Sequence, residues 1–119
     1  MEISNCVNKN VAIEKINAVQ PKLNAVVTMI DEDANTNEGK LSGVPVVLKD
    51  NISTCGIKTT ASSRILDNYV PVYDATIVKK LRSAGADFVC KASMDELGMG
   101  GTGTTGHTGI VHNPWDTSR

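Results

Sequence analysis

The chain has 119 residues, with 12 Lys and Arg against 13 Asp and Glu, and three cysteines. This length suits one domain, and a net charge of −1 without a basic stripe argues against direct binding of DNA. No apolar run approaches membrane-spanning length, no leader-like segment is present, and the cysteines Cys6, Cys55 and Cys90 lack metal-ligand spacing. The sequence therefore predicts a cytoplasmic protein with no metal site, no disulfide framework and no membrane contact.

The first predicted elements lie in an N-terminal segment, residues 1–40. Apolar residues at helical spacing predict a helix from Asn10 to Gln20, ended by Pro21. The β-branched residues from Leu23 to Ile30 predict an extended stretch. The polar and acidic residues from Asp31 to Lys40 are typical of a loop.

A run of apolar residues, Val44 to Leu48, then leads directly into Lys49. Such a run predicts a strand buried on both faces. The amine of Lys49 would lie at the carboxyl end of this strand, where open α/β sheets gather their ligands. Two states are open to a lysine held there: it stays charged beside Asp50, or burial removes its proton and it acts as a base. A lysine that extends from the strand end into water is the plainer alternative.

The second half of the chain predicts a crossover unit. Residues 50–73 show no sustained period and predict an irregular loop. A helix is expected to open at Asp74, place Ile77, Val78, Leu81 and Ala84 on one face, and end at Gly85. The stretch from Asp87 to Cys90 predicts a second strand, so strand, helix and strand form a βαβ unit with parallel pairing. One helical turn from Met94 to Leu97, capped by Ser93, precedes a glycine-rich run that extends to Gly109.

Several ordered motifs resemble the amidase signature family. They are Val44 to Ile52, Thr59 to Ser63, Tyr73 to Thr76, Lys91 to Gly100 and Asn113 to Asp116, and they cover residues 41–119. Within the family, Met94-Asp95-Glu96 and Asn113-Pro114-Trp115-Asp116 most resemble the A subunits of tRNA-dependent amidotransferases. The resemblance implies the N-terminal part of an α/β amidase signature fold, a mixed and mainly parallel sheet layered with helices. Residues 1–119 would form a single, incomplete domain with its lysine-bearing core over residues 41–119.

The resemblance also implies a Ser–Ser–Lys triad, in which a lysine is the base, one serine relays the proton and a second serine attacks the amide carbonyl. Lys49 matches the family's lysine and is the predicted catalytic residue, with Asp50 and Asn51 in support. The stretch Met99, Gly100 and Gly101 would wall the substrate pocket. Both family serines belong to a Gly- and Ser-rich segment that should follow Asp116, and these 119 residues contain none. We therefore expect no amide hydrolysis by this chain alone.

The implied function is hydrolysis of glutamine to supply ammonia for an acyl-tRNA on a partner subunit, forming Gln-tRNA(Gln) or Asn-tRNA(Asn). The implied partners are the other amidotransferase subunits, glutamine as substrate, and tRNA indirectly through the partner subunit. No cofactor would be bound by this chain, because ATP and Mg²⁺ would be used by that partner. Two alternatives stay open: part of a free-standing amidase for small amides, and a non-catalytic truncated or split interaction module.

The remaining polar motifs favour structural roles. The adjacent serines Ser62 and Ser63 match a structural part of the family pattern, and loop contacts are favoured over nucleophilic attack. Asp95 and Glu96 are neighbours that would not face each other on a helix, so scaffold bonding is favoured over acid–base work. The overlapping G-x-G-x-x-G patterns from Gly98 to Gly106 lack the preceding strand and following helix of a dinucleotide site. His107 and His112 are expected on a surface loop.

Overall fold

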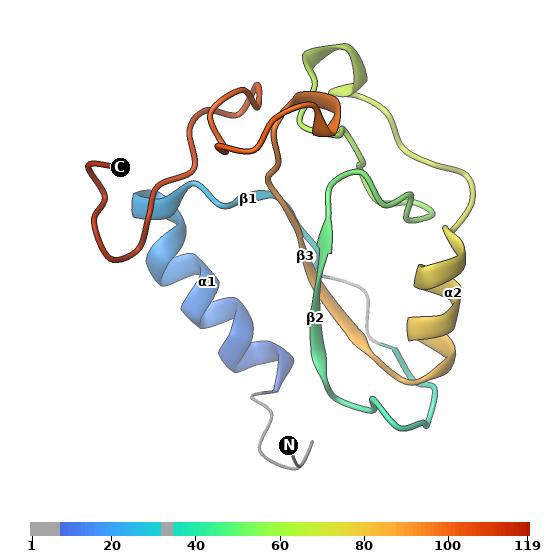
Figure 1. The fold of residues 1–119 in the computed structure, drawn as a ribbon. Helices are drawn as coiled ribbons and strands as arrows, with labels where there is room; N and C mark the ends of the chain where they lie inside the picture. The colour runs from blue at the N-terminus through green and yellow to red at the C-terminus, as the bar shows by residue number, and fades with distance from the viewer. Residues whose placement is uncertain (1–7, 32–34) are drawn as a thin grey trace.

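The structure is a computed structural model that describes residues 8–31 and 35–119. Its elements are α1 (Lys9–Leu23), β1 (Val26–Met29), β2 (Pro45–Lys49), the 3₁₀ helix η2 (Arg64–Leu66), α2 (Thr76–Ser83), β3 (Asp87–Ala92) and the 3₁₀ helix η3 (Glu96–Gly98). Figure 1 shows three layers, with the sheet between α1 on one side and α2 on the other. Within the described part of the chain, no helix has both the length and the hydrophobicity that crossing a bilayer requires.

The three strands form one mixed sheet in the order β1-β3-β2. β2 and β3 are parallel, with Leu48 opposite Lys91 and Lys49 opposite Ala92, whereas β1 runs antiparallel to β3. The predicted βαβ unit is therefore confirmed, with α2 as its crossover helix. Because β2 and β3 are parallel, the loops that follow them meet at the same end of the sheet (Figure 1). This end carries the predicted site.

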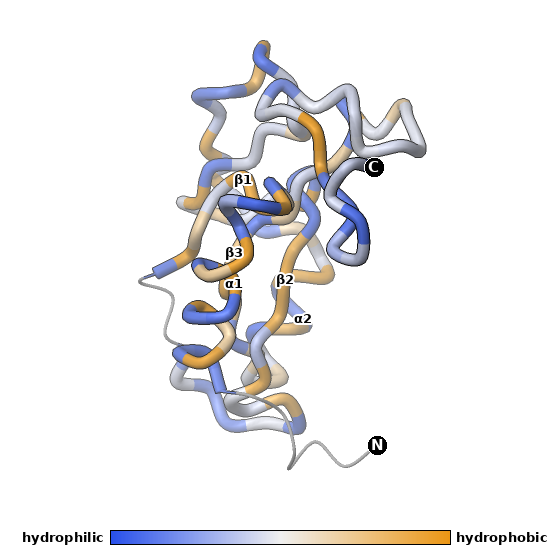
Figure 2. Tube along the Cα trace, turned by 90° about the vertical axis from the view of Figure 1, so that its left-hand side faces the viewer, coloured by the Kyte–Doolittle hydropathy of each residue, from blue (hydrophilic) through white to orange (hydrophobic). Residues whose placement is uncertain are grey.

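The hydrophobic core lies between the sheet and α2. It is built from Ile30, Leu48, Val78 and Phe88, and the Arg82 guanidinium lies 5.0 Å from the centre of the Phe88 ring. Figure 2 shows that β2 is hydrophobic along most of its length. Burial of these side chains on one face of the sheet supplies the main hydrophobic stabilisation of the fold.

The opposite face of the sheet is covered only in part, and the prediction of a strand buried on both faces is wrong. Successive side chains of a strand point to opposite faces, so Val47 and Lys49 project away from the core that holds Leu48. α1 packs against β3 on that side, and no side chain of α1 is fully buried. Val47 is consequently 51% exposed. Hydrophobic composition alone did not reveal that β2 has one covered and one open face.

The structure corrects the predicted boundaries of α1. The Asn8 side chain accepts a hydrogen bond from Val11 N at 3.1 Å and caps the start of the helix, which then continues through Pro21 to Leu23. Pro21 is tolerated because in the last turn its missing N–H removes only one intrahelical bond. The helix ends at Asn24, which has a left-handed φ of 50° and whose N–H donates to Gln20 O. The extended stretch is therefore shorter than predicted and begins at Val26.

The structure also corrects the predicted start of α2. The helix begins at Thr76, and Asp74 instead accepts a hydrogen bond from Cys55 N at 2.7 Å and pairs with Arg82 at 3.4 Å. Ile77 is 53% exposed and does not share the buried face of Val78. The helix still ends near Gly85, whose φ of 89° and tight packing against Asn37 O require a residue without a Cβ.

The predicted turn after β3 is displaced along the chain. The helical turn covers Glu96–Gly98, with Asp95 before it, and Ser93 does not cap it. The Ser93 hydroxyl is buried and has no hydrogen-bond partner in the described residues. Leu97 has a φ of 52°, so the turn is not regular helix.

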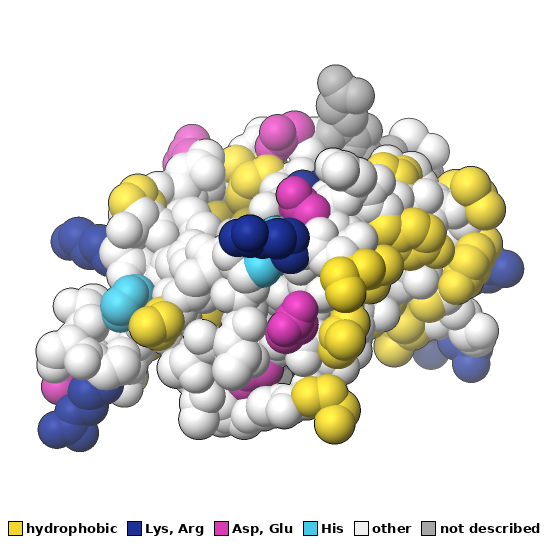
Figure 3. Space-filling view, turned by 90° about the horizontal axis from the view of Figure 1, so that it is seen from above, with side chains coloured by type: hydrophobic (Ala, Val, Ile, Leu, Met, Phe, Trp, Pro, Cys, Tyr) yellow, Lys and Arg dark blue, Asp and Glu magenta, His cyan; other side chains and the backbone are white. Residues whose placement is uncertain are grey.

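Exposed hydrophobic side chains gather on the α2 side of the molecule. Figure 3 shows them along one flank when the fold is seen from above. The segment from residue 64 to residue 77 contributes Ile65, Val72 and Tyr73, with exposed fractions of 89%, 89% and 57%. This surface lies across the sheet from the face that carries Lys49.

Candidate functional site

The predicted catalytic residue lies at the carboxyl end of β2, as the sequence placed it. Lys49 is the last residue of the strand and projects from the open face together with Val47. Its side chain is exposed, and its amine forms no hydrogen bond or ion pair within residues 8–31 and 35–119. In the described residues the amine therefore matches the plainer alternative, a lysine that extends from the strand end into water. The reason is that α1 packs on β3 and leaves this end of β2 open.

Asp50 is buried and organises the loop that follows β2. Its Oδ2 accepts hydrogen bonds from Thr60 N at 3.1 Å, from the Thr60 hydroxyl and from Ser62 N at 3.3 Å. These bonds hold Ala61 and Ser62 in left-handed conformations, with φ of 49° and 50°. Non-glycine residues rarely adopt this conformation, so the carboxylate holds a strained turn in place. Residues 60–63 are called the Asp50 turn below.

Asn51, the other predicted supporting residue, behaves differently. It is exposed, and its side chain makes no hydrogen bond in the described part of the chain. The second oxygen of Asp50, Oδ1, is buried and also has no hydrogen-bond partner there.

A second lysine, which sequence reasoning did not single out, is buried beneath this loop. Lys91 lies on β3, and its ammonium donates to Ile52 O at 2.6 Å, Thr59 Oγ1 at 2.9 Å and Thr54 Oγ1 at 3.3 Å. Burial lowers the pKa of Lys91 to about 8, and the negative charge of Asp50 opposes that shift. All three N–H bonds of an ammonium find acceptors here, so this lysine holds the loop rather than offering a free amine.

The signal for Lys91 was present in the sequence but fell outside the predicted strand. The prediction ended this strand at Cys90, whereas β3 continues to Ala92. Lys91 therefore lies inside a strand, on the same face as Leu48, and must be buried. A lysine flanked by apolar residues within a continuous strand would have indicated a buried charge that needs partners.

The Asp50 turn connects the end of β2 to the glycine-rich loop after β3. Asp50 O accepts a hydrogen bond from Ala61 N at 3.0 Å, and Ala61 O accepts one from Leu97 N at 3.0 Å. Ser62 Oγ accepts a hydrogen bond from Met94 N at 3.1 Å. The turn thus places the predicted substrate-wall residues, Met99 to Gly101, at the same end of the sheet as Lys49.

The two adjacent serines are structural here. Ser62 and Ser63 are both buried, and the Ser63 hydroxyl donates to the Glu96 carboxylate at 2.7 Å. Asp95 is also buried and accepts several backbone hydrogen bonds from the glycine-rich loop. These contacts match the structural roles that the sequence favoured for the serine pair and for the two acidic residues.

His107 lies in the predicted loop and is only partly exposed, with 16% of its side chain accessible. Its ring lies 3.2 Å from Asp67 Oδ1, and the same oxygen pairs with Lys58 at 2.7 Å. The hydrogen bond from Lys58, followed by that from His107, lowers the pKa of Asp67 below its usual range. This cluster fastens the glycine-rich segment to the loop after β2. Cys55 is exposed and lies outside the cluster.

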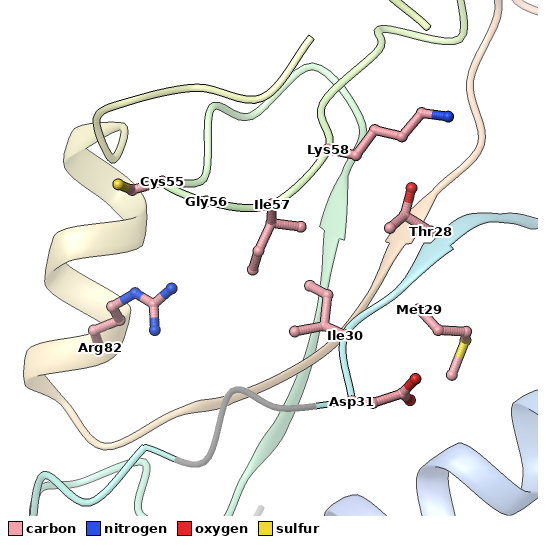
Figure 4. A pocket seen from close by; sticks show the side chains of 9 residues that line it. All are labelled: Thr28, Met29, Ile30, Asp31, Cys55, Gly56, Ile57, Lys58 and Arg82. Atoms are coloured by element: carbon pink, nitrogen blue, oxygen red, sulfur yellow. The ribbon is translucent and has the colours of Figure 1, made fainter. Parts of the chain in front are cut away.

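A cavity of about 470 Å³ opens on another part of the molecule. Figure 4 shows its lining by β1, the loop after β2 and α2, with Thr28, Met29, Ile30, Asp31, Cys55, Gly56, Ile57, Lys58 and Arg82 around it. Its two cations are already engaged, since Lys58 pairs with Asp67 and Arg82 pairs with Asp74. None of the predicted site residues lines this cavity, so it is separate from the end of the sheet that carries Lys49.

Comparison with known proteins decides the family. A family-wide sequence profile described as Amidase matches residues 10–119. The chain belongs to the amidase family. This amidase chain is 44% identical, over 112 residues, to the glutamyl-tRNA(Gln) amidotransferase A subunit of Lactobacillus acidophilus, covering 90% of the chain and 23% of that protein. It is 46% identical over 115 residues to the same subunit of Sulfolobus acidocaldarius, covering 89% of the chain and 24% of that protein.

Solved structures of amidases share the fold. The glutamyl-tRNA(Gln) amidotransferase A subunit of Thermotoga maritima matches with a TM-score of 0.88 and 40% identity, over 93% of this chain and 25% of that one. A 6-aminohexanoate cyclic dimer hydrolase matches with a TM-score of 0.87 and 30% identity, over 93% of this chain and 24% of that one. The predicted fold class is therefore confirmed. The amidase chain spans about a quarter of the length of these relatives.

Proposed function

We propose that this chain supplies the lysine-bearing part of an amidase site that hydrolyses glutamine and releases ammonia. The observation that carries the proposal is the position of Lys49 at the carboxyl end of a parallel strand, on a face of the sheet that is open beside it. A covering segment that brings serines to this face would exclude water from the amine, which is the condition under which a lysine serves as a base. The half-exposed Val47 beside it supports the idea that this face is covered in the complete protein.

The chemistry assigns one task to this chain. Both serines would be carried by a segment outside these residues. One attacks the amide carbon of glutamine through its hydroxyl oxygen, and its proton passes through the other serine to the amine of Lys49. The C–N bond then breaks, the leaving nitrogen takes a proton and departs as ammonia, and water hydrolyses the resulting ester to glutamate. Asp50 and the buried Lys91 hold the loop after β2, so they fix the strand end from which Lys49 projects. Met99, Gly100 and Gly101 would form one wall of the glutamine pocket.

The similarity to the A subunits of amidotransferases supports a role in a larger complex. We place the chain in the cytoplasm, with a partner subunit that receives the ammonia and uses ATP and Mg²⁺ to activate the acyl group of a bound tRNA. The product would be Gln-tRNA(Gln) or Asn-tRNA(Asn). The chain itself would contact tRNA only through that partner, which agrees with its balanced charge.

The test measures ammonia release from glutamine in two samples. The first contains the 119-residue chain alone, and the second contains the chain fused to the remaining serine-bearing part of the Thermotoga maritima protein. We expect release only from the fusion, because the chain carries Lys49 but no Gly- and Ser-rich segment. Ammonia release by the chain alone would contradict the proposal.

A second set of substrates separates the main proposal from its rival. The fold match to the 6-aminohexanoate cyclic dimer hydrolase favours, as the alternative, an amidase that acts on small amides. The fusion is therefore assayed with glutamine and with that cyclic amide. Preference for glutamine supports the amidotransferase role, whereas preference for the cyclic amide supports the free-standing amidase. A fusion that is folded and inactive on both would favour a non-catalytic interaction module.

A further inference from the structure

The glycine-rich loop after β3 is closed around a single carboxylate. Asp95 accepts hydrogen bonds from four successive backbone N–H groups, those of Thr102, Gly103, Thr104 and Thr105, at 2.8 to 3.0 Å. The Thr105 hydroxyl donates to it as well, at 3.0 Å. The bond from Thr105 N, followed by that from Gly103 N, holds the pKa of Asp95 far below its usual range. These hydrogen bonds therefore favour the ionised form of Asp95.

Both ends of this loop are anchored on the Asp50 turn. Leu97 N donates to Ala61 O at 3.0 Å, and His107 N donates to Ser62 O at 2.9 Å. A Cβ on Gly106 would lie only 2.8 Å from Met94 O, so the returning end of the loop packs directly on the chain that leaves β3. The ends of the loop are thus fixed by the turn and its middle by Asp95.

The stretch between the first anchor and the residues bound by Asp95 is Met99 to Gly101. It is exposed, and the N–H groups of Gly100 and Gly101 form no hydrogen bond within the described residues. Gly100 instead lies against the carboxyl group, because a Cβ built on it would be 2.6 Å from Asp95 Cγ. A Cβ on Gly101 would meet nothing within 4 Å. The position of Gly100 therefore depends on Asp95, whereas Gly101 has free space around it.

We infer that Asp95 is a positioning residue that fixes the shape of the substrate wall formed by Met99, Gly100 and Gly101. This inference rests on the proposed function, because it assigns to Asp95 an effect on the binding of glutamine. The contacts of Asp95 are with the loop, through its hydrogen bonds to Thr102, Gly103, Thr104 and Thr105. Asp95 acts through the loop, so its loss raises KM while the chemistry at Lys49 proceeds at nearly the same rate.

The first arm of the experiment measures the loop itself in the 119-residue chain. Hydrogen exchange of the Thr102 to Thr105 amides is compared between wild type and the variants Asp95→Asn, Gly100→Ala and Gly101→Ala. In wild type, both carboxylate oxygens of Asp95 accept hydrogen bonds from backbone N–H groups. In Asp95→Asn one of these oxygens is replaced by an NH₂ group, which cannot accept them. Asp95→Asn is therefore expected to speed exchange by about tenfold or more. Gly100→Ala should act in the same direction through its clash with the carboxyl group, whereas Gly101→Ala should leave exchange unchanged. Unchanged exchange in Asp95→Asn would overturn the inference.

The second arm measures glutamine hydrolysis in the fusion protein. Asp95→Asn is expected to raise KM by about tenfold and to change kcat by less than about threefold. Glu38→Gln, an exposed loop carboxylate before β2, serves as the matched control and should leave both constants unchanged. The double variant Asp95→Gly/Gly100→Ala should have the same KM as Asp95→Gly alone, because glycine removes both the carboxyl group and the Cβ that the new methyl group would meet.

The two possible failures are distinguishable. A folded wild-type fusion that releases no ammonia from glutamine overturns the proposed function, and the inference about Asp95 falls with it. An active fusion in which Asp95→Asn lowers kcat and leaves KM unchanged overturns the positioning role alone. Additive effects of Asp95→Gly and Gly100→Ala on KM would also overturn it.

Discussion

The buried charges of Asp50 and Lys91 are expected to depend on each other, and a double-mutant cycle tests this. Asp50→Asn removes one charge and keeps an oxygen acceptor for Thr60 and Ser62. Lys91→Met removes the other charge and keeps a similar length. Each single variant leaves one buried charge without its opposite, because both side chains are fully buried. The double variant removes both charges, so no buried charge is left without an opposite charge nearby.

The structure sets the expected magnitudes. Burial that lowers the pKa of Lys91 from 10.5 to about 8 corresponds to about 3 kcal/mol of unfavourable charge burial. Each single variant is expected to lower the free energy of unfolding by about 3 kcal/mol, in the range measured when one partner of a buried pair is removed. The double variant should be no less stable than either single one, which gives a coupling energy of at least about 3 kcal/mol.

Urea unfolding followed by circular dichroism provides the assay. Fluorescence is a poor probe here, because Trp115 is 94% exposed and senses little of the core. Lys79→Met, an exposed lysine on α2, is the matched control and should change stability by less than about 0.5 kcal/mol. Additivity of the Asp50 and Lys91 variants within about 0.5 kcal/mol would refute the reasoning.

The same cycle predicts a pH dependence. Between pH 8 and 10.5 the folded chain has already lost the Lys91 proton while the unfolded chain still holds it, so the unfolded state binds more protons. The free energy of unfolding, measured relative to Lys91→Met, should therefore rise by up to about 3 kcal/mol across this window. In Asp50→Asn the pKa of Lys91 should fall below its wild-type value, since Asp50 raises it. A fall in relative stability over this window would contradict the assignment.

Three further predictions concern the rest of the fold. Exposed Cys55 should react quickly with iodoacetamide at pH 8, whereas Cys90 should react only on unfolding, because burial raises its pKa to about 11. Peptide mapping by mass spectrometry measures both rates, and equal rates would contradict this prediction. Val78→Ala should lower the free energy of unfolding by about 2 kcal/mol, because Val78 is fully buried between α2 and the sheet. A change of less than about 0.5 kcal/mol in urea unfolding would place Val78 outside the core. Asn24→Ala should lower the free energy of unfolding by about 2 kcal/mol. The variant places alanine in a left-handed conformation and loses the side-chain hydrogen bonds to Thr108 O and Ile110 O. An unchanged midpoint of urea unfolding would contradict this prediction.

The sequence predicted the order of elements well because its periodicity changes where the structure changes. The apolar run before Lys49, the helical spacing around Val78 and the stretch after Gly85 each matched one element of the βαβ unit. The chain of motifs also placed Lys49 and the glycine-rich loop at one end of the sheet. The burial of the strand that carries Lys49 was predicted wrongly, because the composition of a strand does not tell which of its two faces other elements cover.

The contacts that hold the site were largely hidden in the sequence. Asp95 binds backbone N–H groups seven to ten residues later, and backbone donors carry no signature in the side chains. Lys91 was missed because the predicted strand ended at Cys90, two residues before the end of β3. Asp50 was expected to brace the strand end, but the left-handed conformations of Ala61 and Ser62 that it holds could only be seen in three dimensions.

The most direct test of the central claim is ammonia release from glutamine by the fusion protein with Lys49→Met. The claim is that the amine of Lys49 is the base that receives the proton of the attacking serine through the relay serine. Loss of the amine should lower kcat by at least about 10³-fold, while the control Lys79→Met retains wild-type activity. A Lys49→Met fusion that is folded and hydrolyses glutamine at a rate close to that of wild type would contradict the claim.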